Sequence, residues 1–570
     1  MTIIDERREV AAADAVAEQP RVSVRGLSVA FETSSGIRSI VSDVSFDLLP
    51  GQCVAIVGES GSGKSVTART IVGLTGRGAV VEADRIDLHG RDVRALAPRR
   101  WRHVRGREVG FILQDALVSL DPLRPVGAEI AETLRLHGWR GRRTRQAKAV
   151  DLLDAVGVPL PALRARQRSG QLSGGLRQRA LIASALALDP DVIIADEPTT
   201  ALDVTVQAQV LALLEESKNR GASIILISHD LSVVAQLADH IIVMREGLVV
   251  EQGSAGALLR NPREDYTRAL IAAVPSEATR GTALSPDSAE LIAETPVTAP
   301  EVGEVVLAAS ALVKHFRAPD GSTTAAVDDV SFTLGRGETL GIVGESGSGK
   351  STTGRIALAL ERPDSGEVKL LGQPWTSISE PRRRALRSRI AVVSQDPLSS
   401  FDPRWNVERI LLDAVPIRDY AGAARAERIR ELLDQVGLPE EVLQRFPLRL
   451  SGGQRQRIAI ARALATSPDV IVLDEAVSAL DVTIQAQILD LLVLLQRRLG
   501  LSYLFISHDL GVISHLSHRV LIMKDGRVVE EGTPDDIFHR PQHPYTRQLI
   551  ASIPAEIPHA SPTLELRSTT

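Results

Sequence analysis

Two identical octapeptides carry the clearest chemistry in this chain: Gly-Glu-Ser-Gly-Ser-Gly-Lys-Ser occupies residues 58–65 and occurs again at 344–351. Glycines at these intervals let backbone N–H groups converge on one anion, and a helix that starts directly behind them adds the positive end of its dipole. The lysine can reach the β- and γ-phosphates of a nucleotide, and the final serine hydroxyl can ligate Mg²⁺. One copy alone is compatible with a plain Gly-rich turn, whereas two identical copies predict two phosphate cradles.

A short apolar run precedes each cradle, at residues 53–57 and 339–343, and we expect both runs to be strands. A strand that leads through a Gly-rich turn into a helix is the context in which this motif binds phosphate. The predicted cradle residues are Gly58, Glu59, Ser60, Gly61, Ser62, Gly63, Lys64 and Ser65 in the first copy and Gly344, Glu345, Ser346, Gly347, Ser348, Gly349, Lys350 and Ser351 in the second.

A pair of acidic residues ends an apolar run in each half of the chain: Asp196-Glu197 and Asp474-Glu475. Such runs are typical of buried parallel strands, and ligands bind at the carboxyl ends of these strands in open α/β sheets. The first carboxylate can hold Mg²⁺, directly or through water, and the second can act as general base on an attacking water. An acidic pair alone is weak evidence, but behind a cradle it predicts nucleotide hydrolysis.

Two histidines, His229 and His508, each follow an apolar run in the sequence Ile-Ser-His-Asp. An isolated histidine is more often structural than functional. Because both copies place it at nearly the same distance beyond the acidic pair, we favour a contact with the γ-phosphate.

The chain reads as one domain duplicated in tandem, because every landmark recurs in the same order. Apolar strand-like runs alternate with helical patterns in each copy, which predicts a mostly parallel α/β sheet. We place the domains at 22–275 and 305–556, after a disordered N-terminus at 1–21 and before a tail at 557–570. Residues 276–304 are acidic and contain proline, which predicts a weakly structured linker.

Composition excludes several classes of protein. A chain of 570 residues with 44% hydrophobic and 24% charged residues has room for several packed domains. Cys53 is the one cysteine, so no intrachain disulfide and no all-cysteine metal or iron–sulfur site can form. No apolar run is long enough for a membrane span, and the N-terminus lacks the pattern of a signal peptide, so we expect a cytoplasmic protein. The net charge of −5 argues against general nucleic-acid binding, and we interpret the Arg-rich stretch 91–107 as a solvated helical face.

The chain resembles the ATPase subunits of ABC transporters. Besides the cradles, the resemblance is carried by Leu-Ser-Gly-Gly-Leu-Arg-Gln-Arg at 172–179 and Leu-Ser-Gly-Gly-Gln-Arg-Gln-Arg at 450–457, which look like the family signature. Most other cradle ATPases lack this signature. The resemblance implies an α/β fold of two tandem P-loop NTPase ABC nucleotide-binding domains, each with a RecA-like core, an antiparallel β subdomain and a helical subdomain.

The resemblance also implies how ATP is enclosed. In the family the signature helix contacts ATP held by the opposite domain, so the two halves of this chain are expected to complete each other's sites. The signature residues are Ser173, Gly174 and Gly175 in the first copy and Ser451, Gly452 and Gly453 in the second. The first site would combine Lys64, Ser65, Gln114, Asp196, Glu197 and His229 with Ser451 and Gly453. The second would combine Lys350, Ser351, Gln395, Asp474, Glu475 and His508 with Ser173 and Gly175.

Other positions match the family's motifs. Gln114 and Gln395 look like its metal-sensing glutamines. Asp203 and Asp481 lie in Ala-Leu-Asp segments that resemble the family's loop across the interface between domains. Phe31 and Phe316 precede the cradles and could stack on adenine, although a lone phenylalanine is more often part of a core. Both sets of catalytic residues are complete, which predicts two hydrolytically competent sites. The second copy has Ala476 where the first has Pro198, and this difference removes no functional group.

The segments 261–275 and 540–554 look like the C-terminal extension of ATPases that serve oligopeptide, dipeptide and nickel importers. This resemblance implies a peptide importer with two transmembrane permease subunits and an extracytoplasmic solute-binding protein, and a chain bound peripherally at the cytoplasmic face of the cell membrane. Nickel or glutathione uptake and an exporter remain alternatives, because fold-level analogy alone carries the choice of solute. A ribosome-associated tandem ABC protein is a remote alternative, since its linker is typically helical and basic.

Overall fold

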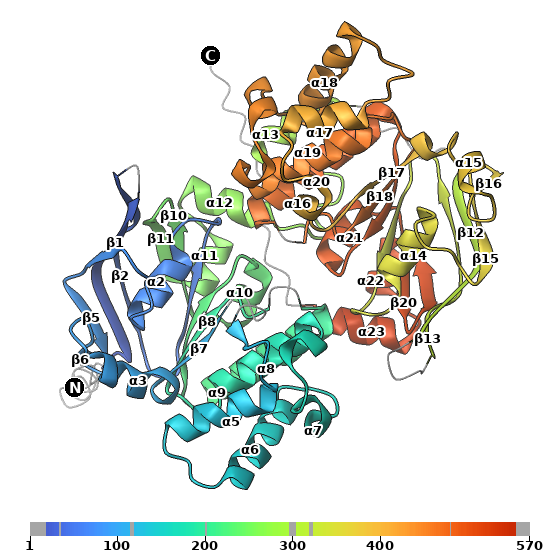
Figure 1. The fold of residues 1–570 in the computed structure, drawn as a ribbon. Coiled ribbons are helices and arrows are strands. Elements are labelled where there is room, and N and C mark those ends of the chain that lie inside the picture. The colour runs from blue at the N-terminus through green and yellow to red at the C-terminus, as the bar shows by residue number, and fades with distance from the viewer. Residues whose placement is uncertain are drawn as a thin grey trace, which may run out of the picture. The chain divides into compact units, whose positions relative to one another are not determined.

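The computed structural model describes residues 19–33, 36–113, 119–199, 202–295, 304–317, 323–478 and 480–553. The chain divides into two compact units (Figure 1). The first unit comprises the described part of Met1–Leu202 together with Val206–Arg268, and the second comprises Asp203–Thr205 and Ala269–Ile553.

A six-stranded sheet in the order β11-β10-β3-β9-β8-β7 forms the centre of the first unit. All neighbouring pairs are parallel except β10 and β11. The strands β3, β8 and β9 are buried along their whole length, as continuous apolar runs in parallel sheets are. The strands are β3 (Cys53–Val57), β7 (Val109–Ile112), β8 (Val192–Asp196), β9 (Ser223–Ile227), β10 (His240–Arg245) and β11 (Leu248–Ser254).

A second, antiparallel sheet of the first unit has the order β2-β1-β5-β6, with β4 also paired to β1. Buried and half-buried residues alternate along much of β1, the pattern of a strand with one face on a core. Its strands are β1 (Val22–Thr33), β2 (Gly36–Leu48), β4 (Ala79–Glu82), β5 (Arg85–Leu88) and β6 (Arg91–Asp92).

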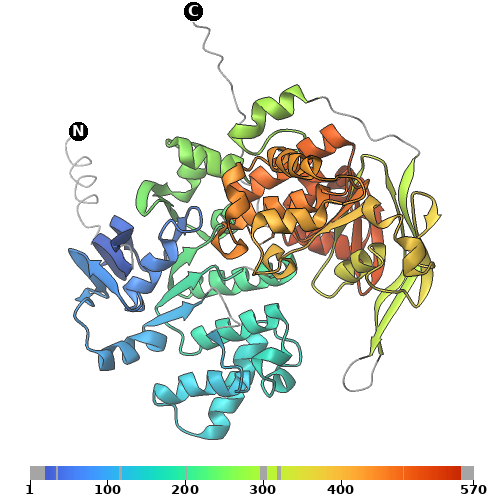
Figure 2. The same ribbon diagram turned by 45° about the horizontal axis from the view of Figure 1, so that its top comes forward.

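Some helices of the first unit cover the parallel sheet, and others form a separate group beside it. The helices α5, α6 and α8 pack on one another in this group (Figure 2). The Arg-rich stretch that we expected to be one helical face contains β6 and then α3, in which Val104 is the one buried residue. The helices are α2 (Lys64–Ile71), α3 (Pro98–Arg107), α5 (Val126–Leu136), α6 (Arg142–Ala155), α7 (Pro161–Arg164), α8 (Gly174–Ala185), α9 (Val204–Asn219), α10 (Leu231–Leu237), α11 (Ala255–Arg260) and α12 (Asp265–Ala272).

The second unit repeats this architecture. Its parallel sheet has the order β17-β18-β19-β14-β20-β21 and its antiparallel sheet the order β13-β12-β15-β16. The strands are β12 (Val305–Arg317), β13 (Thr323–Gly335), β14 (Thr339–Val343), β15 (Ser365–Leu370), β16 (Gln373–Pro374), β17 (Ile390–Val393), β18 (Val470–Asp474), β19 (Ser502–Ile506), β20 (Arg519–Lys524) and β21 (Arg527–Gly532). The helices are α14 (Lys350–Ala357), α15 (Glu380–Arg383), α16 (Pro397–Ser400), α17 (Val407–Ala414), α18 (Ala423–Gln435), α19 (Gly452–Leu464), α20 (Val482–Leu499), α21 (Leu510–Leu516), α22 (Pro534–His539) and α23 (Pro544–Ala551).

The segment between the two domains differs from the weakly structured linker that we expected. Residues 276–295 contain the helix α13 (Pro286–Glu294), which packs against α20. The buried Asp490 carboxylate accepts hydrogen bonds from the backbone N–H groups of Leu284 (3.0 Å) and Ser285 (2.9 Å). Leu284 and Ile292 are both buried, and Arg497 Nη1 donates to the Ile292 carbonyl oxygen at 2.7 Å, so apolar contacts and hydrogen bonds together hold this segment.

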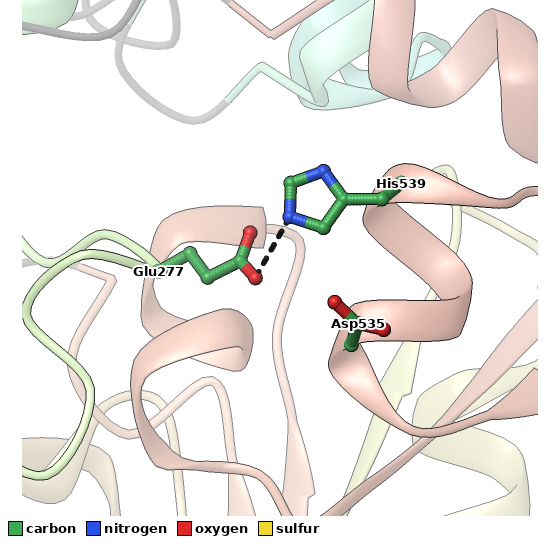
Figure 3. Close-up of side chains that lie close together, drawn as sticks. All are labelled: Glu277, Asp535 and His539. Carbon is green, nitrogen blue, oxygen red and sulfur yellow. Dashed lines mark hydrogen bonds and ion pairs between the residues drawn. The ribbon is translucent and has the colours of Figure 1, made fainter.

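An ion pair also holds the start of this segment. His539 Nε2 of α22 lies 2.9 Å from Glu277 Oε1, and Asp535 projects from the first turn of the same helix toward them (Figure 3). Asp535 is itself paired with Arg540. The terminal segments expected at 1–21 and 557–570 lie outside the described residues, apart from residues 19–21.

Candidate functional site

Each cradle is shaped by glycines that no other residue could replace. A Cβ atom added at Gly58 would lie 2.1 Å from the Met244 carbonyl oxygen, and one added at Gly344 would lie 2.1 Å from that of Met523. Gly63 and Gly349 precede α2 and α14 in the left-handed conformation, with φ of 97° and 98°. The loop is therefore pressed against the end of β10 in one unit and of β20 in the other.

The cradle lysines are buried under their own loops. Lys64 Nζ donates to the carbonyl oxygens of Gly58 and Glu59, both at 2.7 Å. Lys350 Nζ donates to those of Gly344 (2.7 Å) and Glu345 (2.9 Å). Burial lowers the pKa of Lys350, although nearby carboxylates oppose this effect.

The last residue of each cradle contacts the first residue of the acidic pair. Ser65 Oγ donates to Asp196 Oδ1 at 2.7 Å, and Ser351 Oγ donates to Asp474 Oδ1 at 3.1 Å. Burial raises the pKa of both aspartates, while the serine hydrogen bonds act in the opposite direction. Asp196 Oδ2 is buried and has no hydrogen-bond donor among the described residues; Arg69 Nη2 lies 3.6 Å away. A buried carboxylate oxygen without a hydrogen-bond donor, beside a serine hydroxyl, fits the ligand preferences of a Mg²⁺ ion.

The glutamates of the acidic pairs have an unusual backbone conformation. Glu197 and Glu475 both have a φ of 50°, in the left-handed region that residues with a Cβ seldom adopt. Their N–H groups donate at 2.9 Å to the carbonyl oxygens of Ile227 and Ile506, which continues the pairing with the neighbouring strand. Strained conformations of this kind concentrate at functional sites.

The predicted histidines lie beside these glutamates. His229 Nδ1 is 3.5 Å from Glu197 Oε1, and His508 Nδ1 is 3.5 Å from Glu475 Oε1. The hydrogen bond from His508 lowers the pKa of Glu475, so its carboxylate is ionised at neutral pH. Burial alone would lower the pKa of His508, but the hydrogen bond to Glu475 and its charge outweigh burial and raise it.

Gln395 also reaches the general-base candidate: its Nε2 donates to Glu475 Oε2 at 2.7 Å. The sequence suggested a metal-sensing glutamine, and the structure brings this amide to the glutamate next to the metal candidate Asp474. Gln114, its predicted counterpart, lies outside the described residues.

The signature residues form exposed helix N-termini. Ser173 caps α8 by accepting from Leu176 N (3.4 Å), and Ser451 caps α19 by accepting from Gln454 N (3.2 Å). Gln454 Oε1 accepts in return from Ser451 N (3.2 Å), a reciprocal bond that Leu176 cannot make. The exposed Gly174 and Gly452 follow the serines, and Gly175 and Gly453 come next. Free N–H groups at a helix N-terminus suit an anion.

The predicted adenine-stacking residues occupy equivalent places in the two antiparallel sheets. Phe31 of β1 pairs with Arg38 of β2. Two residues further along β2, the carbonyl oxygen of Ile40 lies against Gly63 of the first cradle. Phe316 of β12 pairs with Thr324 and is 44% exposed, and Lys314 Nζ lies 5.5 Å from the centre of its ring. Phe31 is half-buried against the core of its sheet.

Two site residues escaped the sequence analysis. The hydroxyl oxygens of Tyr266 and Tyr545 accept hydrogen bonds from the cradle N–H groups of Glu59 and Glu345, both at 3.2 Å. The signal was present in the Tyr-Thr-Arg sequence that recurs in both tail segments. We interpreted it only as a mark of the subfamily.

Comparison with known proteins decides the family. Residues 41–200 and 327–478 match the sequence profile described as "ABC transporter". The chain belongs to the ABC transporter family. It is an ATPase with two tandem ATP-binding domains, which confirms the predicted family, fold class and enzyme class. Residues 250–295 and 529–569 match a second profile, "Oligopeptide/dipeptide transporter, C-terminal region", so the tail segments of this ABC ATPase, including α13, resemble that region.

Relatives of this ABC ATPase span nearly its whole length. It is 44% identical over 560 residues to the glutathione import ATP-binding protein GsiA of Shigella flexneri, covering 94% of this chain and 90% of the relative. It is 40% identical over 607 residues to the oligopeptide transport ATP-binding protein OppD of Mycobacterium bovis, covering 95% and 99%. A dimeric bacterial ABC transporter cassette of known structure matches 40% of the chain at 29% identity, with a TM-score of 0.37. Among the described residues of this ABC ATPase, no helix has the length and apolar character to cross a bilayer.

Proposed function

We propose that this chain is the ATP-hydrolysing subunit of a membrane importer for peptides, and that both of its ATP sites are active. The observation that carries the proposal is the pairing of Glu197 with His229 and of Glu475 with His508, each at 3.5 Å at the carboxyl end of a central strand behind a complete cradle. The family profiles and the relatives' names support the transport role.

In the proposed reaction, the cradle N–H groups and the lysines bind the phosphates of ATP. The ionised Glu475 carboxylate accepts a proton from the water that attacks the γ-phosphate, and Gln395 holds the other carboxylate oxygen in place. His508, protonated to a higher pH than an ordinary histidine because its pKa is raised, orients the carboxylate and would contact the γ-phosphate. Glu197 and His229 perform the same steps in the first copy.

Ser65 with Asp196, and Ser351 with Asp474, would hold Mg²⁺, together with Gln114 and Gln395. The buried Asp196 Oδ2, which has no hydrogen-bond donor among the described residues, supports this assignment. When bound, the ion neutralises charge on the phosphate oxygens.

The proposal includes three kinds of partner. Each cradle would be completed by the signature helix of the other domain, so that Ser451 and Gly453 serve the first site and Ser173 and Gly175 the second. Asp203 and Asp481 would lie in the loops between the domains, and Phe31 and Phe316 would stack on adenine. Two permease subunits would bind the chain at the inner face of the cell membrane, and an extracytoplasmic binding protein would deliver the solute.

Glutathione is a second candidate solute, because a relative that is 44% identical is a glutathione import protein. Glutathione contains a peptide bond, so it is chemically related to small peptides. Binding of radiolabelled glutathione, but not of di- or oligopeptides, by the cognate binding protein would decide for this alternative.

The proposal is tested by the variants Glu197→Gln and Glu475→Gln, singly and together. Loss of a positioned general base should slow hydrolysis at its site by about 10²–10⁴-fold. Binding of ATP should remain, because the cradles are unchanged. Steady-state release of phosphate and equilibrium binding of ATP measure the two effects. Near-normal hydrolysis in the double variant would refute the assignment.

A further inference from the structure

The two tail tyrosines touch the ATP cradles at equivalent points. Tyr266 lies in α12 and Tyr545 in α23, and each hydroxyl accepts from the N–H group of the second cradle residue. The contact distance is 3.2 Å in both units, although the partners are far apart in the sequence. The duplicated chain therefore presents the same arrangement twice.

A cation and a close backbone contact fix each tyrosine ring. The Arg245 guanidinium lies 5.1 Å from the centre of the Tyr266 ring, and Lys524 Nζ lies 4.5 Å from that of Tyr545. Arg245 and Lys524 end β10 and β20, directly after Met244 and Met523, whose carbonyl oxygens press on the first cradle glycine. In each unit, the end of the strand, the tyrosine ring and the cradle therefore lie next to one another.

A carboxylate on the neighbouring strand holds the start of each tail segment. Glu251 of β11 accepts from the N–H groups of Arg263 (2.9 Å) and Glu264 (3.2 Å). Glu530 of β21 accepts from those of Gln542 (2.7 Å) and His543 (3.0 Å). Burial alone would raise the pKa of Glu530, but these hydrogen bonds outweigh it, so the carboxylate stays ionised.

The tyrosine contact reaches the phosphate-binding lysine through one residue. The N–H group of Glu59 donates to Tyr266, and its carbonyl oxygen accepts from Lys64 Nζ at 2.7 Å. Glu345 joins Tyr545 to Lys350 in the same way, with the lysine at 2.9 Å. Removing the hydroxyl would release the backbone that orients the lysine.

We propose that Tyr266 and Tyr545 are positioning residues of the two ATP sites, which couple the C-terminal tail segments to the conformation of the phosphate cradles. This inference rests on the proposed function, because it assumes that the cradles bind ATP. The inference gives the C-terminal tail segments a role in ATP binding within the ATP-binding domains.

The test is the double variant Tyr266→Phe with Tyr545→Phe in the full chain, which removes both hydroxyls and keeps both rings. The matched control is Tyr503→Phe, because the buried Tyr503 hydroxyl donates to the Leu492 carbonyl oxygen at 3.0 Å within α20 and β19 and does not contact a cradle. Binding of a non-hydrolysable ATP analogue in the presence of Mg²⁺ is measured by calorimetry, and KM and kcat for ATP are measured separately.

The double variant should raise the Kd for the analogue about three- to ten-fold, the loss expected for one hydrogen bond per site. KM for ATP should rise in parallel and kcat at saturating ATP should stay within about two-fold, since no group that touches the reacting atoms is changed. An unchanged Kd, a fall in kcat with an unchanged KM, or an equal loss in Tyr503→Phe would overturn the proposal. A wild-type chain that binds no analogue would instead refute the proposed function.

Discussion

The His508–Glu475 pair shows how two neighbouring side chains set each other's protonation. His508 is buried, and burial disfavours its charged form, yet Glu475 raises its pKa above the ordinary value. A pKa that is raised on folding adds stability that is fully present below the unfolded pKa, about 6.5, and is lost as the pH rises through the folded value. The pair therefore stabilises the fold most below about pH 6.5, while Glu475 is still ionised, and contributes less as the pH rises further.

Replacing Glu475 by Gln should lower the pKa of His508. The substitution removes the carboxylate that raises this pKa and leaves burial, which lowers it. Titration of ¹³C-labelled histidine by NMR would follow the change, with His508→Gln used to assign the signal. A pKa of His508 that is unchanged in Glu475→Gln would contradict the ion pair.

The cradle glycines give a second prediction at the residue scale. Gly344→Ala should abolish ATP binding at its site, because the new Cβ would lie 2.1 Å from the Met523 carbonyl oxygen. Gly372→Ala is a suitable control for backbone effects, since this glycine also has a positive φ but no atom lies within 4 Å of its added Cβ. Binding of ATP is measured in both variants. Normal affinity of Gly344→Ala would show that the loop can move away from β20.

The sequence predicts those site residues whose side-chain types the chemistry dictates. The lysines, aspartates, glutamates and histidines occur in short motifs, and the structure brings Ser65 to Asp196 and His229 to Glu197. The recurring Tyr-Thr-Arg sequence marks Tyr266 and Tyr545, but their hydrogen bonds to the cradles join residues far apart in the sequence, and the motif alone does not reveal these contacts. Gln395 was found, but its contact with Glu475 depends on the relative placement of two strand ends.

At the scale of elements, average composition misled the prediction for residues 276–295. Acidic residues and proline suggested a loose linker, whereas α13 is held by the buried side chains of Leu284 and Ile292 and by Asp490. Composition averages over a segment, but a few well-placed apolar residues decide whether it packs. The mostly parallel sheet of each unit was predictable, because continuous apolar runs indicate buried parallel strands, but the order of the strands was not.

Asp490→Asn should loosen this segment. The amide can accept only through one atom, so one of the N–H groups of Leu284 and Ser285 loses its partner at a cost of about 1–3 kcal/mol. Hydrogen exchange of residues 276–295 should become faster, while exchange in β14 stays slow. The control is Asp434→Asn on α18, where the side chain is exposed. Equal exchange rates in Asp490→Asn and the wild type would refute the role of this carboxylate.

At the scale of the whole molecule, the proposed exchange of signature helices predicts which double variants share a site. On a Glu197→Gln, Glu475→Gln background, Lys64→Ala with Ser451→Arg should damage one site and leave one ATP retained per chain after rapid gel filtration. Lys64→Ala with Ser173→Arg should damage both sites and leave none. If both combinations retain the same amount of ATP, the two domains do not complete each other's sites.

The left-handed backbone conformation of Glu197 and Glu475 implies a conflict between catalytic activity and the stability of the fold. Glutamate occupies a position whose backbone conformation favours Gly or Asn, at a strain of about 1–3 kcal/mol each. We therefore expect Glu475→Asn to raise the melting temperature of the second unit while it abolishes hydrolysis there, whereas Glu475→Gln, which keeps the strain, should lack this gain. Calorimetric scans of the two variants would reveal the difference. An inactive copy of such a domain, freed from selection for turnover, would be expected to drift toward the more relaxed residue.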